Sequence, residues 1–337
     1  MKTVEMPIKQ APVPEKLPIL KEKGKKKDRI ICGLLLSFIF INLAVLPIFW
    51  KTYKEKQKEK IQIAKAEIAT TTISASTFFQ DLKLEARAFI VYDPETERVI
   101  FGQEENVARP LASLTKVMTV LTASELTPMD KTQVIIDEEA LAEEGESGLQ
   151  PNSAWNLKNL ADFTLVVSSN DGAKAIANTV ASVSSTDFVQ EMNKRAGYLG
   201  LASVNFFNET GLDLSSGGAG AYGSPRDIAR LFSYLLKNKS DLLAATSQNR
   251  LTGISPRNNY YSVSNTNLLA NKIPGLLASK TGYTESAGGN LAVAVNLGLR
   301  RPMVFVVMGS SPDGRFNDME KLIIKTQEYL AQTAGQY

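Results

Sequence analysis

Residues 87–101 read RAFIVYDPETERVIF, two β-rich apolar stretches on either side of a polar turn. The segments Arg87 to Tyr92 and Arg98 to Phe101 have strand composition, and the Asp-Pro-Glu-Thr-Glu between them is typical of a turn, so they predict a β-hairpin. Two more β-rich apolar runs, Leu291 to Leu297 and Met303 to Met308, lie near the other end of the chain. We therefore expect one antiparallel sheet whose first and last segments are neighbours.

The chain between these strands is helical by its periodicity. Apolar residues recur at helical spacing in Leu114 to about Ser124, Leu157 to Val167 and Asp171 to Val180, and Asn317 to Gln332 predicts a closing amphipathic helix. Ser224 followed by Pro225 and Asp227 has the pattern of a helix N-cap. Strands at both ends with helices between them predict an α+β (mixed α/β) fold, an antiparallel sheet flanked by helices.

The N-terminal quarter of the chain differs from the rest. Residues Ile30 to Trp50 form a run of 21 without a charge, which is long enough to cross a bilayer. We predict a transmembrane helix at 30–50, a disordered basic cytoplasmic tail at 1–29, a helical stalk at 51–80 and a folded domain at 81–337. A buried core helix and a cleaved signal peptide are the alternatives for the apolar run.

The charges of the chain are distributed unevenly. Residues 1–29 carry +5 and residues 51–67 carry +3, so with +3 overall, residues 68–337 are left at about −5. Because nucleic-acid binding depends on cationic surface, an acidic domain gives no case for a nucleic-acid partner. The lysines before the apolar run favour a cytoplasmic N-terminus, although lysines also follow the run.

The chain contains no histidine, and its single cysteine, Cys32, lies in the apolar run. A Ser-His-Asp triad, a histidine-ligated metal and a cysteine nucleophile in the folded domain are therefore excluded. We expect no cofactor. A serine nucleophile activated by a lysine base is the acyl-transfer chemistry that remains.

The string Ser113-Leu-Thr-Lys116 supplies such a pair. Residues three apart share one face of a helix, so Ser113 and Lys116 would be adjacent, and Pro110 would mark where the helix begins. Enclosure by apolar neighbours would lower the pKa of Lys116 and let its neutral amine take the serine proton. The competing interpretation is an N-capping serine followed by a surface lysine.

The string Ser168-Ser169-Asn170 falls at a break between two predicted helices. Its first hydroxyl could relay a proton among Ser113, Lys116 and the leaving group, and the Asn170 amide could hold a substrate amide. Helix capping by these residues is the competing interpretation.

The third string is Lys280-Thr281-Gly282. In a strand beside the nucleophile, Lys280 would supply a fixed positive charge, Thr281 a hydroxyl for a substrate carboxylate, and Gly282 room for the ligand backbone. The N–H of Tyr283 could join that of Ser113 as an oxyanion donor.

These three strings, in this order, resemble the motifs of the serine D-alanyl-D-alanine carboxypeptidases. These are the low-molecular-mass penicillin-binding proteins of peptidase family S11, in the β-lactamase/transpeptidase-like superfamily. The resemblance runs from about Arg87 to the C-terminus. Its further matching segments are Arg109 to Lys116, Ser169 to Ala173, Asn208 to Leu212, Asn265 to Leu269 and Lys280 to Thr284.

The resemblance implies an antiparallel sheet flanked by helices, an all-helical lobe and a site at their junction. It implies that Ser113 attacks the carbonyl between the two D-alanines of a peptidoglycan stem peptide, and that water clears the acyl-enzyme. β-Lactam antibiotics would acylate the same serine. Such a substrate lies outside the cytoplasmic membrane, so we expect a single-pass bacterial membrane protein, held in the lipid bilayer by residues 30–50, with an extracytoplasmic catalytic domain.

Three other functions compete with this assignment. Glu209-Thr-Gly-Leu-Asp213 superficially resembles the Glu-x-x-Leu-Asn of a class A β-lactamase, in which the glutamate activates the deacylating water. A D,D-endopeptidase would use the same site residues. A tethered domain that binds peptidoglycan or penicillin without turnover is the non-enzymatic alternative.

Overall fold

The computed structural model describes residues 50–60, 74–145, 147–254, 260–298 and 301–333. The chain divides into two units, residues 1–72 and residues 73–337. In the first unit, residues 50–60 are helical, and all of them except Trp50 belong to the predicted stalk. The predicted tail and the rest of the predicted transmembrane segment lie outside the described residues. Among the described helices, none combines the length and the apolar character that a bilayer span needs.

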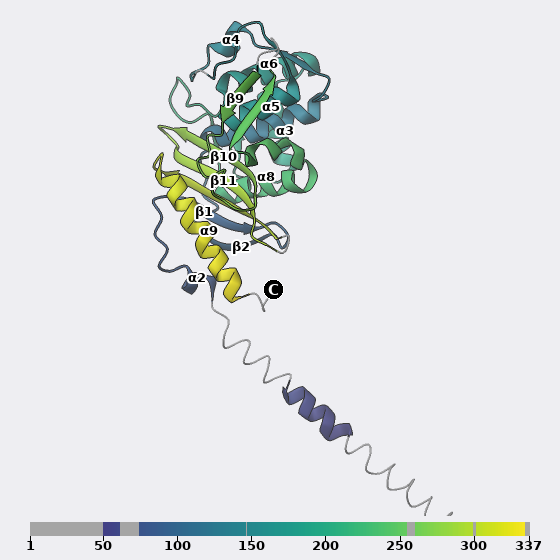
Figure 1. The fold of residues 1–337 in the computed structure, drawn as a ribbon, viewed down its shortest axis with the longest axis vertical. Coiled ribbons are helices and arrows are strands. Elements are labelled where there is room, and N and C mark those ends of the chain that lie inside the picture. The colour runs from purple at the N-terminus through teal and green to yellow at the C-terminus, as the bar shows by residue number, and fades with distance from the viewer. Residues whose placement is uncertain (1–49, 61–73, 146, 255–259, 299–300, 334–337) are drawn as a thin grey trace, which may run out of the picture. The chain divides into compact units, whose positions relative to one another are not determined.

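The second unit is built on a five-stranded antiparallel sheet with the order β10-β11-β12-β1-β2 (Figure 1). The strands are β1 (Ala88–Asp93), β2 (Arg98–Gln103), β10 (Leu276–Thr284), β11 (Gly288–Asn296) and β12 (Pro302–Ser310). The first strand pairs with the last, with Val91 opposite Phe305. The predicted hairpin and the predicted pairing of the chain's two ends are both confirmed.

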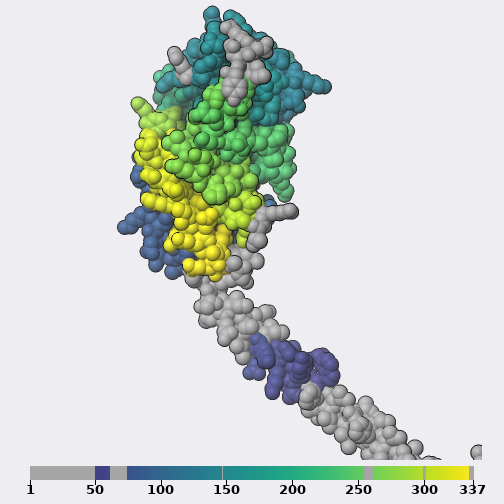
Figure 2. Space-filling view, in the orientation of Figure 1, coloured from purple at the N-terminus to yellow at the C-terminus, as the bar shows by residue number. Residues whose placement is uncertain are grey.

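Helices cover both faces of this sheet, and the alternation of side chains along β1 follows from that. Phe89 and Val91 pack into the apolar cluster that contains Met319 and Leu322 of α9 (Gly314–Gln332). Ile90 and Tyr92 point toward the opposite face of the sheet, into the larger apolar cluster that includes residues of α8 (Pro225–Asn238). Since successive side chains of a strand face opposite sides, a fully buried β1 requires a layer on each face. Figure 2 shows α9 in yellow along one flank of the domain.

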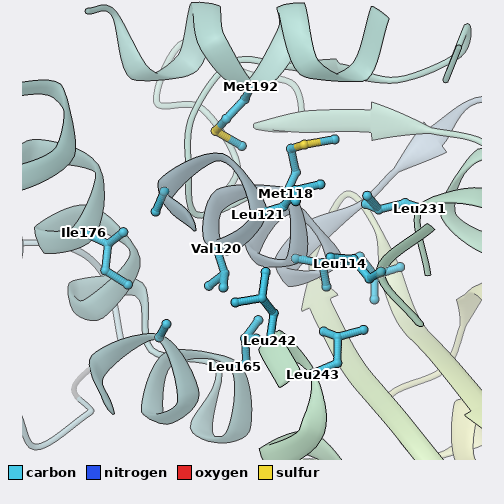
Figure 3. Packing of buried hydrophobic residues seen from close by; sticks show 14 of the residues in the cluster. Leu114, Met118, Val120, Leu121, Leu165, Ile176, Met192, Leu231, Leu242 and Leu243 are labelled. Atoms are coloured by element: carbon cyan, nitrogen blue, oxygen red, sulfur yellow. The ribbon is translucent and has the colours of Figure 1, made fainter. Parts of the chain in front are cut away.

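The helical part of the domain surrounds α3 (Lys116–Leu126), which is apolar on nearly every side. Figure 3 shows Met118, Val120 and Leu121 of α3 projecting toward different neighbours. A helix that is apolar all round has to be buried on all sides, which explains why the other helices enclose it. Those helices are α5 (Leu157–Val167), α6 (Asn170–Ser184) and α7 (Phe188–Tyr198), and the short α4 (Glu138–Leu141) packs on α6.

Short elements complete the domain. They are α2 (Ala75–Phe78), β3 (Arg109–Pro110), η1 (Ala112–Thr115), β4 (Gln133–Ile135), β5 (Ala154–Asn156), β6 (Asn205–Phe206), β7 (Ala221–Gly223), η2 (Ser240–Leu242), η3 (Ala244–Ser247), β8 (Arg250–Ile254) and β9 (Tyr260–Ser264). The Ser224 side chain accepts from the N–H of Asp227, as the capping pattern predicts. The prediction that Pro110 begins a helix is wrong, because Pro110 pairs with Tyr222 in a strand. The helical turn begins only at Ala112.

Candidate active site

Ser113 lies in the 3-10 turn η1, directly before α3, and its side chain is half-buried. Ala112 before it has a φ of +49°, a conformation that a residue with a Cβ rarely adopts. Gly211, with a φ of +80°, presses against this segment so closely that a Cβ there would collide with the Ala112 carbonyl. The backbone of the predicted nucleophile is therefore held by the loop that contains Gly211.

Lys116 lies beneath Ser113, with none of its surface exposed. Its Nζ is 2.9 Å from Ser113 Oγ, 2.6 Å from Asn170 Oδ1 and 2.7 Å from the carbonyl oxygen of Thr210. Two of these partners can only accept, so the two N–H groups of a neutral amine suit them. The lone pair is then left for the hydroxyl of Ser113 to donate into.

The electrostatics of the pocket favour that neutral amine. Burial lowers the pKa of Lys116 to about 7, although the carboxylates of Glu209, Glu143 and Asp171 partly oppose the shift. Near pH 7 a large fraction of Lys116 is therefore uncharged. The structure places Lys116 as a buried amine against the Ser113 hydroxyl, not as the surface lysine of the competing interpretation.

The second string forms the junction between α5 and α6. Ser168 ends α5 with a φ of +64°, and the Ser169 side chain caps α6 by accepting from the N–H of Gly172. The capping interpretation therefore applies to the Ser169 side chain, whereas the side chains of Ser168 and Asn170 bond to other segments. Asn170 accepts from Lys116 and donates through Nδ2 to the carbonyl of Glu144, 2.6 Å away.

Lys280 approaches from β10, the edge strand of the main sheet. Its Nζ donates to Ser168 Oγ and to the carbonyl of Thr281, each 2.8 Å away. Burial, followed by the charges of Lys116 and Arg315, lowers the pKa of Lys280 well below its ordinary value. The sequence predicts a fixed positive charge on Lys280, but its burial and the neighbouring cations disfavour the ammonium form. The relay from Ser168 to Ser113 stays a prediction, since the hydroxyl of Ser168 is bonded to Lys280.

The remaining residues of the third string line the same edge. Thr281 Oγ1 lies 2.6 Å from Thr266 Oγ1. A Cβ on Gly282 would lie 3.2 Å from the backbone N of Ser113, so any other residue would have to push β10 and the Ser113 turn slightly apart. The Tyr283 side chain is about half exposed, and the oxyanion role of its N–H stays a prediction.

Three residues of this site were not predicted from the sequence. Thr210 offers its carbonyl to Lys116, and Arg315 Nη1 donates to the carbonyl of Gly282, 2.6 Å away. Asn290 is fully buried and donates to the carbonyls of Pro110 and Leu111. Thr210 lies in a segment that already resembled the family, whereas single polar residues such as Asn290 and Arg315 carry no recognisable spacing.

Away from this site, the described part of the chain contains a surface cavity but no group of side chains suited to a metal ion. A cavity of about 320 Å³ lies between the β1–β2 turn and α8 and contains none of the predicted site residues. Its lining residues include Tyr92, Arg230, Tyr234 and Lys237. Within the described ranges no group of three or more cysteine, aspartate or glutamate side chains could hold a metal ion.

The family model for D-alanyl-D-alanine carboxypeptidases, peptidase S11, matches residues 70–312. The chain belongs to this family. The predicted family is thus confirmed, and with it the class of enzyme, a serine hydrolase.

Two curated relatives show the extent of the similarity. The chain is 29% identical over 229 residues to the D-alanyl-D-alanine carboxypeptidase DacB2 of Mycobacterium tuberculosis. The matched region covers 68% of this chain and 77% of that protein. The chain is 28% identical over 251 residues to the D-alanyl-D-alanine carboxypeptidase DacF of Bacillus subtilis, covering 72% of this chain. The match spans about three fifths of DacF, 62% of its length.

Solved structures share the fold. A penicillin-binding protein homologue from Mycobacterium tuberculosis superposes with a TM-score of 0.65 at 25% identity, covering 72% of this chain and 92% of the other. Penicillin-binding protein D2 from Listeria monocytogenes, in an ampicillin-bound form, has a TM-score of 0.60 at 26% identity and covers 73% of this chain and 98% of its own. The predicted α+β class, with its antiparallel sheet and helices, is confirmed.

Proposed function

We propose that this protein is a serine D,D-carboxypeptidase that removes the terminal D-alanine from peptidoglycan stem peptides through an acyl-enzyme on Ser113. One observation carries the assignment of the nucleophile. A fully buried lysine amine, with a pKa lowered to about 7, lies 2.9 Å from the hydroxyl of Ser113. A neutral amine at this distance is a competent general base.

In the acylation step, Ser113 Oγ attacks the carbonyl carbon between the two D-alanines while its proton passes to Lys116 Nζ. The tetrahedral intermediate carries its negative charge on the former carbonyl oxygen, which the N–H groups of Ser113 and Tyr283 would stabilise. When the C–N bond breaks, Ser168 passes its hydroxyl proton to the leaving nitrogen and takes up the proton held by Lys116 Nζ, so that D-alanine departs and the amine is neutral again. Ser168 suits this role because its half-buried hydroxyl accepts from Lys280 Nζ and keeps its own hydrogen free to donate.

The second and third motif strings, which contain Asn170 and Thr281, would bind the substrate. The side chain of Asn170 would hold the peptide amide, and the Thr281 hydroxyl would bind the terminal carboxylate. That carboxylate would also supply the negative charge that Lys280 lacks in the free site, and so favour its ammonium form. Gly282 leaves space for the ligand beside β10.

In the deacylation step, water attacks the ester carbonyl and gives a proton to Lys116. The C–O bond to Ser113 breaks, the serine hydroxyl recovers its proton, and the shortened peptide leaves. A β-lactam would form the same ester when Ser113 opens its ring, because the ring amide takes the place of the scissile amide. The ampicillin-bound form of penicillin-binding protein D2 supports penicillins as ligands of this chain.

The comparisons also support an endopeptidase as the second candidate. A D-alanyl-D-alanine endopeptidase of Haemophilus influenzae is 30% identical over 209 residues, covering 69% of that protein. The two activities share the same scissile geometry and differ in whether the leaving amine is free D-alanine or a cross-linked stem peptide. For a β-lactamase, by contrast, the glutamate of the matching motif should be free to activate water, but Glu209 is paired with Lys174.

The test uses the full chain, with Ser113→Ala as the inactive variant and Ser240→Ala, an exposed serine, as the matched control. Each is incubated with a stem pentapeptide and with a cross-linked peptide dimer, and the products are weighed by mass spectrometry. We expect loss of one alanine from the pentapeptide, and no reaction with Ser113→Ala. Cleavage of the dimer alone would favour the endopeptidase.

Labelling by a fluorescent penicillin distinguishes a carboxypeptidase from a β-lactamase and from a binding domain without activity. A stable label on wild type and Ser240→Ala, absent from Ser113→Ala, is the expected result. Fast penicillin turnover with inert peptides would indicate a β-lactamase. If saturating reagent leaves wild type unlabelled, a non-catalytic domain is the better description.

We further propose that residues 30–50 anchor the protein in the cytoplasmic membrane, with the N-terminus inside and the catalytic domain outside. The 21-residue run without a charge, the lysines before it and the extracytoplasmic location of the substrate support this topology. Fractionation of cells expressing the full chain should place the protein in the alkali-resistant membrane pellet. Protease added outside spheroplasts should degrade the catalytic domain, and full protection would contradict the orientation.

A further inference from the structure

Lys174 of α6 forms an ion-pair chain that the proposed mechanism does not use. Its Nζ is 3.5 Å from Glu209 Oε1 and 3.3 Å from Glu139 Oε1. The two carboxylates differ in environment, since the Glu209 side chain is 9% exposed and that of Glu139 is 69% exposed. The buried member of the chain is therefore Glu209, and water screens the other.

The segment that carries Glu209 lies along the first turn of α3. The carbonyl of Glu209 accepts from Thr119 Oγ1 at 2.6 Å, and the next carbonyl, that of Thr210, accepts from Lys116 Nζ at 2.7 Å. Lys116 and Thr119 are three residues apart and share one face of the helix. These two bonds hold the Glu209 backbone beside the catalytic base.

Several charged groups surround the amine of Lys116. Glu209 has the largest effect among the carboxylates, ahead of Glu143 from the end of α4 and Asp171 from α6. The basic groups are Lys280 of β10 and Lys174, and Lys174 lies one turn from Asp171 on α6. Without a counter-charge, this carboxylate cluster would favour the ammonium form of Lys116 and withhold the base from Ser113.

We propose that Lys174 is a positioning residue that keeps the Glu209 carboxylate paired on the α6 side, and so leaves the Lys116 amine available to Ser113. The inference rests on the proposed function of Lys116 as the base, and assigns a role to two residues outside the three motif strings that begin at Ser113, Ser168 and Lys280. Although its partial burial acts in the opposite direction, the pKa of Lys174 is raised by Glu209 and Glu139, so Lys174 remains an ammonium. A permanent cation beside Glu209 is what the pairing requires.

The test measures the rate constant for acylation of the full chain by a fluorescent penicillin at a series of pH values. In wild type this rate should fall at low pH as Lys116 takes up a proton. In Lys174→Met the unpaired Glu209 holds that proton more tightly, so the midpoint should move up by about half to one pH unit. In Glu209→Gln the midpoint should move down by a similar amount, because the carboxylate that most favours the ammonium form of Lys116 is removed.

The double variant Lys174→Met with Glu209→Gln decides whether Lys174 acts through Glu209. We expect its midpoint to equal that of Glu209→Gln, whereas independent contributions would add. Lys174→Arg should restore the wild-type midpoint. Lys194→Met is the matched control, since Lys194 pairs with Glu191 on the exposed side of α7 and should leave the midpoint unchanged.

A merely structural role for Lys174 would lower the rate at every pH or lower thermal stability without moving the midpoint, and that result would overturn the inference. If Lys174→Met does not fold, Glu209→Gln alone must shift the midpoint downward for the inference to stand. Wild type that takes no penicillin label at any pH would instead contradict the proposed function. The two failures are therefore distinguishable.

Discussion

At the scale of single residues, the site depends on burying two lysines close together. Lys116 is entirely buried and Lys280 is 2% exposed, and the charge of Lys116 adds to burial in lowering the pKa of Lys280. Desolvation opposes the ammonium form, and a neighbouring cation opposes it further. A lysine can thus take the part of a base that histidine takes in other acyl-transfer sites, in a chain without histidine.

The first prediction concerns the pH dependence of wild type. With a pKa of about 7, Lys116 is neutral above that pH and protonated below it. Only the neutral amine can accept the serine proton, so acylation by penicillin should fall about tenfold per pH unit below the pKa and level off above it. A profile that is flat across this range would contradict the assignment. Lys116→Arg should be inactive at every pH, because arginine does not lose its proton.

The second prediction concerns Gly282. A methyl group there would lie 3.0 Å from the carbonyl oxygen of Leu111 and 3.2 Å from the Ser113 backbone N, so Gly282→Ala should push β10 away from the nucleophile. We expect acylation to slow by about 10- to 100-fold with little loss of stability. Gly197→Ala is the matched control, since a Cβ there meets no atom within 4 Å. Equal rates for both variants would show that β10 tolerates the displacement.

At the scale of elements, the nucleophile turn is held from two sides. The loop containing Gly211 packs against it from one side. From β11, the buried side chain of Asn290 donates to the carbonyls of Pro110 and Leu111 and accepts from the N–H of Gly309. Because these bonds join a strand interior to the residues before Ser113, they fix the turn relative to the sheet.

The third prediction follows from that connection. Asn290→Ala removes three hydrogen bonds and leaves buried backbone groups without partners, which should lower the free energy of unfolding by about 2–4 kcal/mol. Penicillin acylation should slow as well, because the turn loses its attachment to β11. Urea unfolding followed by circular dichroism measures the first effect. Asn296→Ala, on the same strand, removes a side chain that accepts from the N–H of Gly298 in an exposed turn, and should change neither quantity by a comparable amount.

At the scale of the whole domain, the two ends of the second unit are joined. β1 lies between β2 and β12, and α9 packs on the same sheet. The buried carboxylate of Asp318 in α9 accepts from the N–H groups of Glu85 and Ala86 and from the hydroxyl of Ser310. One side chain thus connects the entry to β1, the end of β12 and the closing helix.

The fourth prediction tests whether this connection contributes to stability without contributing to catalysis. Asp318→Ala should lower the free energy of unfolding by about 2–5 kcal/mol, since hydrogen bonds to a charged acceptor are lost. At low temperature, where the domain remains folded, penicillin labelling of Ser113 should match wild type. Glu320→Ala, an exposed change on the same helix, should be close to neutral. Loss of labelling in a folded Asp318→Ala protein would show that α9 also shapes the site.

The local pattern of the sequence was enough to predict the hairpin at 87–101, the extent of α5 and the cap at Ser224, because periodicity and turn chemistry act within a few residues. The three motif strings likewise identified the residues that the structure brings together. Local pattern failed at Pro110, where the β3 pairing with Tyr222 overrides the tendency of proline to begin a helix.

Tertiary structure alone decided the charge state of the site. Whether Lys116 is a base depends on how completely it is desolvated and on which carboxylates lie near it, and these come from segments far away in the chain. The same is true of the Lys174–Glu209 pair and of the bonds made by Asn290 and Arg315. Burial and Coulomb energy depend on distances through space, and sequence spacing specifies those distances only within a single element.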